Sequence, residues 1–354
     1  MMENHSEVDN RSTGSLLSLS NTTNSDNVMR ELPQIIYYEI IGFTALLTNG
    51  FLVYLILTRK RLWKIQNVKL CSMSMSGILF AILFCLPYPL VVMDPTNILC
   101  YLKTSLRNFL MSCMCLHLAL IAIDRAITVG MPFHFSNFVN RRTTWIYLTL
   151  VWVMALIGSF YPVLTFRTVK RDDKNPCTTS GDAGDELIYN IFFYSFCYLC
   201  PLKIMLICHG YIFIIALRHL KQMNNEQYPS FDPVQRRKSQ LITKQFKAAV
   251  PLIIITGTFI LLTLPYIICS MIALILGSSP LKLRLRFIRL IVNCLRASEY
   301  GLRELAFAYP ALNPLLYIWL SRDIRSEIIE MCKRPLVRIP ISGTKTSALR
   351  LAIC

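Results

Sequence analysis

The sequence predicts an all-α membrane protein, folded as a bundle of seven transmembrane helices. Of its 354 residues, 54% are hydrophobic and only 16% are charged, whereas a soluble domain carries about a quarter charged residues. A membrane-spanning helix needs about 20 mainly apolar residues, and segments of at least that length follow one another along the chain. The seven segments are 34–58, 67–93, 100–124, 145–166, 187–217, 248–276 and 292–320.

The seventh segment has the weakest hydrophobic signal. Its first half carries four charged residues, namely Arg296, Glu299, Arg303 and Glu304. From Leu305 to Leu320 it is uncharged. We expect a helix to cross here as well, because charged residues inside a helix bundle can face a water-filled cavity.

The basic residues predict how the bundle lies in the membrane. The connections 59–66, 126–144 and 218–247, together with the tail from residue 321, carry twice as many Lys and Arg residues as the opposite side. The side richer in Lys and Arg is normally cytoplasmic. We therefore expect the N-terminus to be extracellular.

The N-terminal tail is polar and carries three N-x-S/T sequences, at Asn4, Asn10 and Asn21. Such sequences accept glycans only on the extracellular side, which agrees with the orientation above. The tail has no basic start followed by a short apolar core, so we expect no cleaved signal peptide. The expected organisation is an extracellular glycosylated tail at 1–33, the seven-helix domain at 34–320 and a cytoplasmic tail at 321–354.

The cytoplasmic tail begins with a predicted short amphipathic helix at about 322–332. Ile324, Ile328 and Ile329 fall on one helical face with charges opposite, a pattern typical of a helix that lies on a membrane surface. Cys332 follows this face. A palmitoylated cysteine and an ordinary thiol are equally compatible with its position.

The formal net charge of +17 does not indicate nucleic-acid binding. The Lys and Arg residues cluster in short connections between apolar segments, and no separate basic face exists. The thirteen cysteines include one C-x-x-C pair, Cys197 and Cys200. It lies inside an apolar segment without a second such pair, so we expect neither a metal site nor a cofactor. Most of them lie inside apolar segments, where a thiol behaves as a small hydrophobic group.

Several residues stand in a fixed order along the seven segments. The third segment opens with Cys100 and reaches Asp124-Arg125 25 residues later. The remaining landmarks are Asn49, Pro132, the pair Trp152 and Pro162, Pro201, the pair Phe259 and Pro265, and the sequence Asn313-Pro314-Leu315-Leu316-Tyr317. With these landmarks the chain resembles a rhodopsin-like G-protein-coupled receptor over roughly residues 34–332.

The resemblance implies partners and roles for these residues. The expected partners are a heterotrimeric G protein, arrestin, an unidentified extracellular ligand and the lipid bilayer of the plasma membrane. A disulfide between Cys100 and Cys177 would hold the long outer loop over the cavity mouth. Arg125 would pair with Asp124 at rest and face the G protein when active. The residues expected to serve coupling and activation are Asp124, Arg125, Pro132, His209, Lys244, Lys247, Phe259, Pro265, Asn313, Pro314 and Tyr317.

The chain departs from the family pattern at several positions. Ala126 replaces the tyrosine after Asp-Arg, and Gly77 stands where the second helix usually has its sodium-binding aspartate. Thr263 replaces the tryptophan of the sixth helix, and His209 replaces a tyrosine of the fifth. These changes are expected to weaken the usual resting contacts and to alter the active ones. High basal activity and poor coupling both remain open.

Two arginines predict the chemistry of the ligand. Arg107 stands at the position of the aspartate in amine receptors, so an amine ligand is disfavoured by charge repulsion. Residues 290–320 contain no lysine, which excludes a retinal Schiff base there. Arg107 and Arg303 could clamp a carboxylate or phosphate, and Glu299 and Glu304 could equally well neutralise both arginines.

An acidic peptide, an organic or fatty acid and a nucleotide all suit such a clamp. Basic residues of the preceding outer connection would steer an anion toward it, namely Lys282, Arg284, Arg286 and Arg289. The expected ligand-binding residues are Arg107, Asn108, Met111, Thr263, Tyr266, Glu299, Arg303 and Phe307.

Three other functions compete with that of a signalling receptor. A transporter or ion-translocating protein would use the buried charges as a pathway, but its typical paired broken helices are absent. A receptor-like scaffold that no longer couples stays open because of the departures above. An enzyme is not expected, since the sequence lacks Gly-x-Ser-x-Gly and His-Glu-x-x-His motifs.

Overall fold

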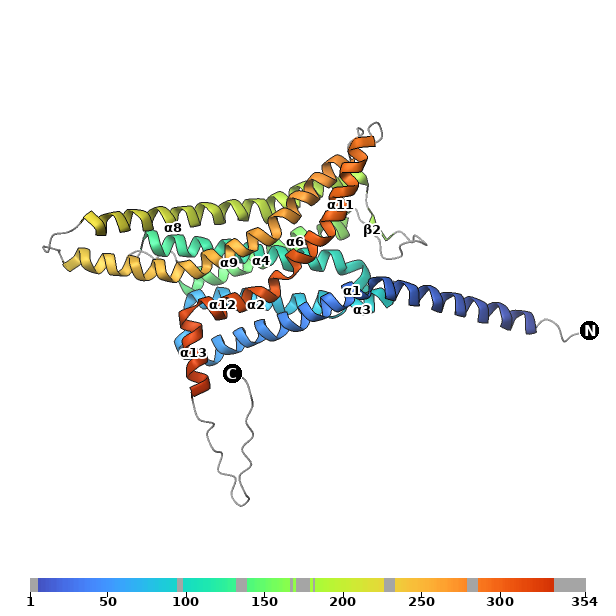
Figure 1. The fold of residues 1–354 in the computed structure, drawn as a ribbon, viewed down its shortest axis with the longest axis horizontal. Helices are drawn as coiled ribbons and strands as arrows, with labels where there is room; N and C mark the ends of the chain where they lie inside the picture. Colours follow the sequence, from blue (N-terminus) through green and yellow to red (C-terminus); the bar gives the residue numbers. More distant parts are fainter. Residues whose placement is uncertain are drawn as a thin grey trace, which may run out of the picture.

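The structure, a computed structural model, describes residues 6–93, 98–131, 139–165, 168–169, 179–180, 182–225, 233–278 and 286–333. Long helices run side by side and make up almost all of it (Figure 1). The helices of the first half are α1 Ser6–Thr58, α2 Ile65–Phe80, α3 Tyr88–Met93, α4 Ile98–Gly130 and α6 Arg141–Thr165. Those of the second half are α7 Ala183–Tyr194, α8 Cys200–Asn225, α9 Pro233–Ser278, α11 Arg286–Phe307, α12 Tyr309–Leu320 and α13 Arg322–Lys333.

Short irregular elements complete the chain. Lys60–Leu62 is a 3₁₀ turn, and Ala81–Cys85 and Ser195–Leu199 are π turns. The two π turns come just before Pro87 and Pro201, which cannot donate a backbone hydrogen bond. Strands β1 Thr168–Val169 and β2 Thr179–Ser180 pair antiparallel in the connection between α6 and α7, with Thr168 opposite Ser180.

Six helical spans in the described residues are long and apolar enough to cross a membrane. They are Glu31–Thr58, Ile65–Met93, Leu102–Gly130, Arg141–Thr165, Gly184–Arg218 and Ala249–Leu276. Each overlaps one of the first six predicted segments, which confirms them as helices. The third continues six residues beyond its predicted end at Asp124, so Asp124 and Arg125 lie within the helix and not at its end.

The seventh predicted segment consists of two helices that meet at Ala308. Pro310 has no N–H to donate to a carbonyl of the preceding turn, which interrupts the helical hydrogen bonds. Neither half is a membrane span by itself, because α12 has only 12 residues and α11 carries the charged residues. The two halves together complete the bundle, since α12 packs against α1 and α9, and α11 packs against α9.

Helix α1 begins much earlier than the apolar segment that predicts it. It runs without a break from Ser6 through Pro33 to Thr58. Secondary structure therefore does not mark the expected boundary between residues 33 and 34, and that boundary stays a prediction.

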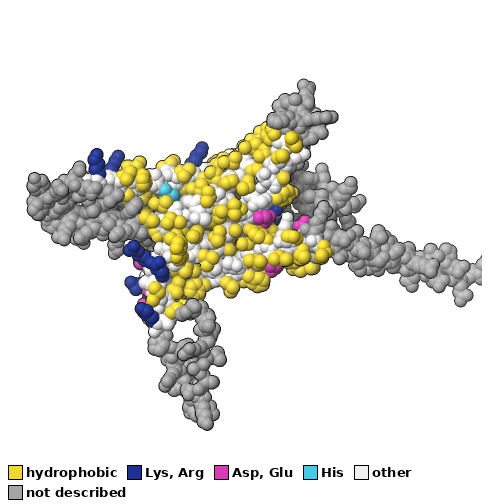
Figure 2. Space-filling view, in the orientation of Figure 1, with side chains coloured by type: hydrophobic (Ala, Val, Ile, Leu, Met, Phe, Trp, Pro, Cys, Tyr) yellow, Lys and Arg dark blue, Asp and Glu magenta, His cyan; other side chains and the backbone are white. Residues whose placement is uncertain are grey.

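The outside of the bundle is apolar, as a membrane requires. Leu164, Ile207 and Leu261 are 81%, 71% and 72% exposed, which would be costly in water. Figure 2 shows hydrophobic side chains covering the visible face, with most of the Lys and Arg side chains near one end. Inside, Phe80, Phe259 and Tyr309 are among the large side chains without exposed surface.

Helix α13 matches the predicted amphipathic helix to within one residue at its end. Its Ile324 is buried against the bundle. Lys64 Nζ lies 2.5 Å from Asp323 Oδ2, which ties α13 to the connection between α1 and α2. Cys332 is exposed near the end of the helix.

Candidate functional site

Six of the eight residues expected to bind a ligand line one small cavity inside the bundle. Arg107, Asn108 and Met111 reach it from α4, Thr263 and Tyr266 from α9, and Phe307 from α11. Two tyrosines that the sequence analysis did not include complete the lining, Tyr194 and Tyr198. The two tyrosines are four residues apart, just before Pro201, and therefore lie on one helical face. This spacing is a sequence signal that could have predicted their place in the pocket.

Aromatic side chains close this central pocket. The Phe307 ring centroid lies 6.0 Å from that of Phe80, 5.7 Å from Phe84 and 6.2 Å from Tyr266. The remaining volume is about 10 Å³, which is enough for about one water molecule. A ligand can therefore occupy the pocket only after these rings change rotamer.

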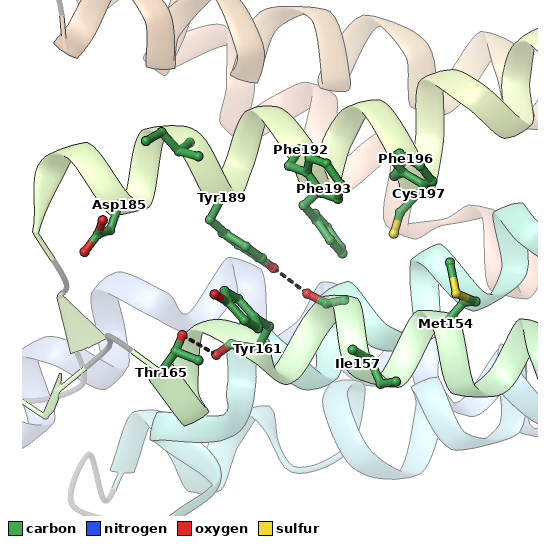
Figure 3. A pocket seen from close by; sticks show the side chains of 12 residues that line it. Met154, Ile157, Tyr161, Thr165, Asp185, Tyr189, Phe192, Phe193, Phe196 and Cys197 are labelled. Carbon is green, nitrogen blue, oxygen red and sulfur yellow. Dashed lines mark hydrogen bonds between the residues drawn. The ribbon is translucent and has the colours of Figure 1, made fainter.

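A much larger cavity lies elsewhere, between α6 and α7, with a volume of about 670 Å³ (Figure 3). It shares no lining residue with the central pocket. None of the residues expected to bind a ligand lies there. We call it the α6–α7 groove.

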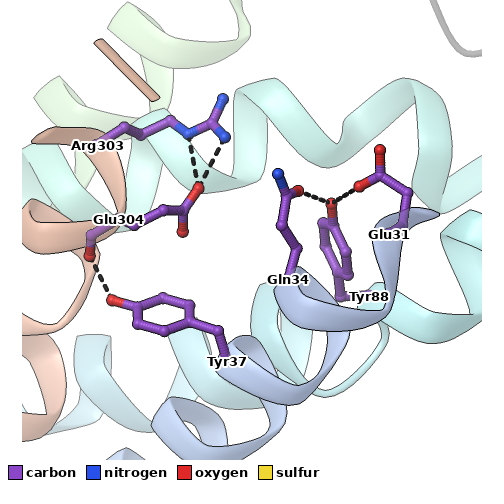
Figure 4. A network of polar contacts seen from close by, with 6 residues as sticks. All are labelled: Glu31, Gln34, Tyr37, Tyr88, Arg303 and Glu304. Carbon is purple, nitrogen blue, oxygen red and sulfur yellow. Dashed lines mark hydrogen bonds and ion pairs between the residues drawn. The ribbon is translucent and has the colours of Figure 1, made fainter. Parts of the chain in front are cut away.

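Arg303 is neutralised by its neighbour in the sequence. Its Nε and Nη2 lie 3.1 and 2.7 Å from Glu304 Oε1 (Figure 4). The hydroxyl of Tyr37 donates to the backbone carbonyl of Glu304. Of the two alternatives for Arg303, the internal ion pair is the one observed, and Arg303 does not line the central pocket.

Neither the expected anion clamp nor the expected neutralisation of the arginines by acidic residues fully describes Arg107 and Glu299. The Arg107 guanidinium lies 5.7 Å from the Phe307 ring centroid, and its Nε is 3.4 Å from Asn108 Oδ1. It forms no ion pair among the described residues. Glu299 accepts a 2.6 Å hydrogen bond from Ser270 and lies outside the pocket lining. Neutralisation by an acidic residue therefore holds for Arg303 and not for Arg107.

The neighbouring residues Asp124 and Arg125 are arranged differently from the expectation. Asp124 Oδ1 lies 2.7 Å from Nζ of Lys69 on α2, and both side chains are almost fully buried. Arg125 forms no ion pair in the described part of the chain, and its Nε has no hydrogen-bond partner. The expected pair between Asp124 and Arg125 is thus replaced by a pair between two helices. A lone lysine in the second apolar segment was the available signal.

Asn49 packs against Gly77, the residue at the expected position of the sodium-binding aspartate. Its Nδ2 donates to the carbonyls of Ala45 and Pro310, at 2.8 and 2.9 Å. A Cβ atom on Gly77 would lie 2.7 Å from Asn49 Oδ1, so a side chain at that position requires Asn49 to move. This close packing therefore favours the glycine that replaces the aspartate.

The remaining activation residues on α9 and α12 pack together. The Phe259 ring contacts that of Tyr309 at a centroid distance of 4.8 Å, and the Tyr309 hydroxyl donates to Asn313 Oδ1 at 3.1 Å. The hydroxyl of Tyr317 is buried without a hydrogen-bond partner, as are both ring nitrogens of His209. These groups are available for contacts with water or with another arrangement of the helices.

Some expected residues lie outside the part of the chain that is described. Asn4, Pro132 and Cys177 belong to undescribed segments. For a second group only the helical backbone is described, namely Asn10, Asn21, Cys100, Lys244 and Lys247. Their roles, including the Cys100–Cys177 disulfide, stay predictions.

A bundle of membrane helices around a small central pocket, with a buried Asp-Arg site at one end, defines a seven-helix membrane receptor. Residues 48–317 match the family described as 7 transmembrane receptor (rhodopsin family). The chain therefore belongs to the rhodopsin family of seven-transmembrane receptors.

Individual relatives are distant. The G-protein coupled receptor 161 of Mus musculus is 24% identical over 328 residues, which cover 84% of this chain and 57% of that protein. The Histamine H2 receptor of Homo sapiens is 26% identical over 274 residues, covering 75% of this chain and 70% of that receptor. The fold also matches squid rhodopsin with a TM-score of 0.66 at 18% identity, over 84% of this chain and 83% of that one. The chain spans less than two thirds of the length of the first of these relatives.

Proposed function

We propose that this protein converts the binding of an extracellular ligand into activation of a heterotrimeric G protein at the plasma membrane. The observation that carries the proposal is the state of Arg125. Its expected partner Asp124 is paired with Lys69, and Arg125 forms no ion pair among the described residues. A guanidinium offers five donors in a rigid fork, and here they can bind the carbonyl and carboxylate oxygens of a G-protein tail. Arrestin is a further candidate partner of the same surface.

The proposal includes an orientation in which the N-terminus is extracellular. Arg125 and α13 then lie at the cytoplasmic end of the bundle. The salt bridge between Lys64 and Asp323 belongs to that end, in line with its excess of basic residues. Arg107 and Asn108 belong to the first third of α4, so the central pocket then lies nearer the extracellular side than Arg125 does.

The ligand of this receptor is proposed to be an anion. Lys103, one turn before Arg107 on α4, interacts electrostatically with Arg107 and Arg303 and with the carboxylates of Glu31 and Glu304. Arg107 lines the central pocket and forms no ion pair among the described residues, which favours anionic ligands. Arg107 is the cation that no acidic residue neutralises, so it would bind the carboxylate or phosphate directly. An amine such as histamine would be repelled.

Basal activity is expected to be high. A pair between Asp124 and Arg125 would hold the arginine at rest, and Lys69 removes that restraint. His209, which replaces a tyrosine expected to hold Arg125 in the active state, has no hydrogen-bond partner at either ring nitrogen.

The proposal can be tested with the purified full-length protein in nanodiscs. Nucleotide exchange would be measured on purified G proteins of each α-subunit class, without additive and with oleate, ATP or a polyglutamate peptide. Acceleration of exchange by at least one class supports the proposal. No acceleration with any G protein and any anion would instead support a receptor-like scaffold that does not couple.

A further inference from the structure

Lys203 carries a charge at mid-membrane depth on the outer face of the bundle. It belongs to α8, which runs along one edge of the bundle (Figure 1), and it lies near the middle of the span Gly184–Arg218. A residue at the centre of the hydrocarbon core is about 15 Å from water on either side. The four-carbon stem of a lysine is too short to carry its ammonium group that far, so the charge stays in the hydrocarbon.

Nothing in the described part of the chain neutralises Lys203. The side chain is exposed and forms no ion pair there. Leu206 and Ile207, one turn further along α8, are 58% and 71% exposed, so the surface around Lys203 is one that meets lipid. Lys69, which also lies inside a membrane span, is by contrast buried against Asp124. An unpaired ammonium group in hydrocarbon is costly, and charges at this depth normally have an ionic partner.

The exposed residues around Lys203 have the spacing of a helix-packing surface. They follow one another along α8 at alternating steps of three and four residues, as in the seam of a coiled coil. We call them the α8 stripe, which consists of Cys200, Lys203, Ile207, Gly210, Ile214 and Leu217. Helix α1 has exposed residues at the same spacing, but none of them is charged, namely Ile36, Ile40, Phe43 and Leu47. Lys203 therefore distinguishes the α8 stripe from an ordinary lipid-facing surface.

Gly210 makes the α8 stripe accessible to another helix. It lies two turns beyond Lys203 and is exposed. A Cβ atom on Gly210 would have no other atom within 4 Å, so packing inside the bundle does not require a glycine at this position. Small residues at the surface of a membrane helix let a second helix approach closely.

Neither a second copy of this chain nor a phospholipid suits the charge of the α8 stripe. In a symmetric dimer the same surface of both copies meets, so Lys203 would face Lys203. The two ammonium groups would repel each other strongly in a medium of low dielectric constant. The phosphate of a phospholipid lies at the membrane surface and does not reach mid-membrane depth. A partner that covers Lys203 must instead bring a negative charge into the hydrocarbon.

We propose that the α8 stripe binds a transmembrane helix of another membrane protein, and that this helix carries an Asp or Glu side chain at mid-membrane depth. The carboxylate would pair with Lys203, and Gly210 would let the two backbones approach. Such a contact removes an unpaired intramembrane charge from each of the two proteins, which favours the complex over the separate helices. The contact is independent of the ligand and of the G protein.

Binding of defined peptides to the purified full-length protein in lipid vesicles tests the proposal. The probe is a fluorescent transmembrane peptide of about 20 Leu and Ala residues with one Glu at its centre. Its matched control carries Gln in place of Glu. Energy transfer from the labelled receptor measures the affinity of each peptide. We expect the Glu peptide to bind about ten-fold more tightly than the Gln peptide, as expected for a strong polar contact between membrane helices.

Substitutions in the α8 stripe give a second readout. Lys203→Leu should reduce binding of the Glu peptide to that of the Gln peptide. Lys203→Glu should restore tight binding to a peptide with Lys at its centre, because the charges of the pair are then exchanged. Gly210→Ile should weaken binding of the Glu peptide by blocking close approach. Lys221→Leu is the matched control and should change nothing, since Lys221 is an exposed lysine of the same helix beyond the end of the span.

Cys200 provides a crosslinking site next to Lys203. It is exposed on the α8 stripe, whereas Cys208 of the same helix is half-buried and lies on another side. A Glu peptide with a cysteine three residues to one side of its Glu should form a disulfide with Cys200 under mild oxidation. Mass spectrometry of the crosslinked fragments should find Cys200 and not Cys208. Peptides with the cysteine before or after the Glu report the relative direction of the two helices.

Three outcomes would overturn the proposal. One is equal binding of the Glu and Gln peptides to the wild type, a comparison that needs no variant. A second is tight binding of the Glu peptide by Lys203→Leu. The third is a disulfide between the Cys200 residues of two receptor copies that excludes the Glu peptide, which would assign the α8 stripe to self-association.

Discussion

Lys69 Nζ lies 2.7 Å from Asp124 Oδ1, and both side chains are at most 3% exposed. This salt bridge joins α2 to α4 inside the bundle. It occupies the carboxylate that the neighbouring Arg125 would otherwise bind. Breaking a buried ion pair from one side is strongly destabilising, because the other charge stays buried without a partner.

Lys69→Met should therefore lower the free energy of unfolding by about 3–5 kcal/mol. The double substitution Lys69→Met with Asp124→Leu removes both charges and should recover most of that loss. Thermal unfolding of the purified protein in nanodiscs measures both effects. Lys203→Met is the control, since Lys203 is exposed and forms no ion pair among the described residues. An unfolding temperature of Lys69→Met equal to that of the wild type would contradict this account of the pair.

The same substitution should also change signalling. With Lys69 removed, Asp124 is free to pair with Arg125 on the same helix, which restores the resting contact. We expect basal G-protein dissociation in cells to fall at matched surface expression. A rise in basal signal would show that Lys69 itself holds the receptor at rest.

Gly77 should tolerate no side chain. The Cβ of Gly77→Ala would lie 2.7 Å from the amide atoms of Asn49, and relieving that overlap should cost about 1–3 kcal/mol of stability. Gly50→Ala is a matched control on α1, because nothing lies within 4 Å of its Cβ. Thermal unfolding of the two variants should separate them clearly. Equal stability would mean that Asn49 can move aside.

Arg107 and Arg303 should differ as ligand-binding residues. For an anionic agonist, Arg107→Ala should raise the half-maximal concentration about 10- to 100-fold, the range expected for lost charge-assisted hydrogen bonds. Arg303→Ala should have a much smaller effect, because Glu304 already neutralises Arg303. Dose–response curves of the two variants decide the matter. The reverse ranking would place the anion at Arg303.

Sequence patterns predicted the parts of the fold that depend on local composition. Six apolar segments coincide with membrane-spanning parts of helices, although α1 and α9 begin well before their segments, and Ile324 and its neighbours predicted α13. The positions of the family landmarks predicted that Arg107, Thr263 and Phe307, from three different helices, line one cavity, as they do. Periodicity alone could not have done so, because these residues are far apart in the chain.

Other features depend on which helices lie next to each other. The partner of Asp124 is 55 residues away on another helix, and no local pattern identifies it. The same holds for the α6–α7 groove, whose two walls are separated by the outer loop. The break at Ala308 was not predicted. Pro310 lacks the backbone N–H that would continue the helix, but it lies inside an apolar run, and the hydrophobic pattern alone gives no sign of the break.

The most direct test of the receptor hypothesis compares the wild type with Arg125→Ala in cells at matched surface levels, by direct G-protein dissociation for each α-subunit class. Arg142→Ala serves as the control, since Arg142 is an exposed arginine in the first turn of α6. We predict a wild-type signal above mock-transfected cells that Arg142→Ala keeps and Arg125→Ala loses. A wild-type signal that Arg125→Ala retains in full, or no wild-type signal for any class, would contradict coupling through Arg125 with high basal activity.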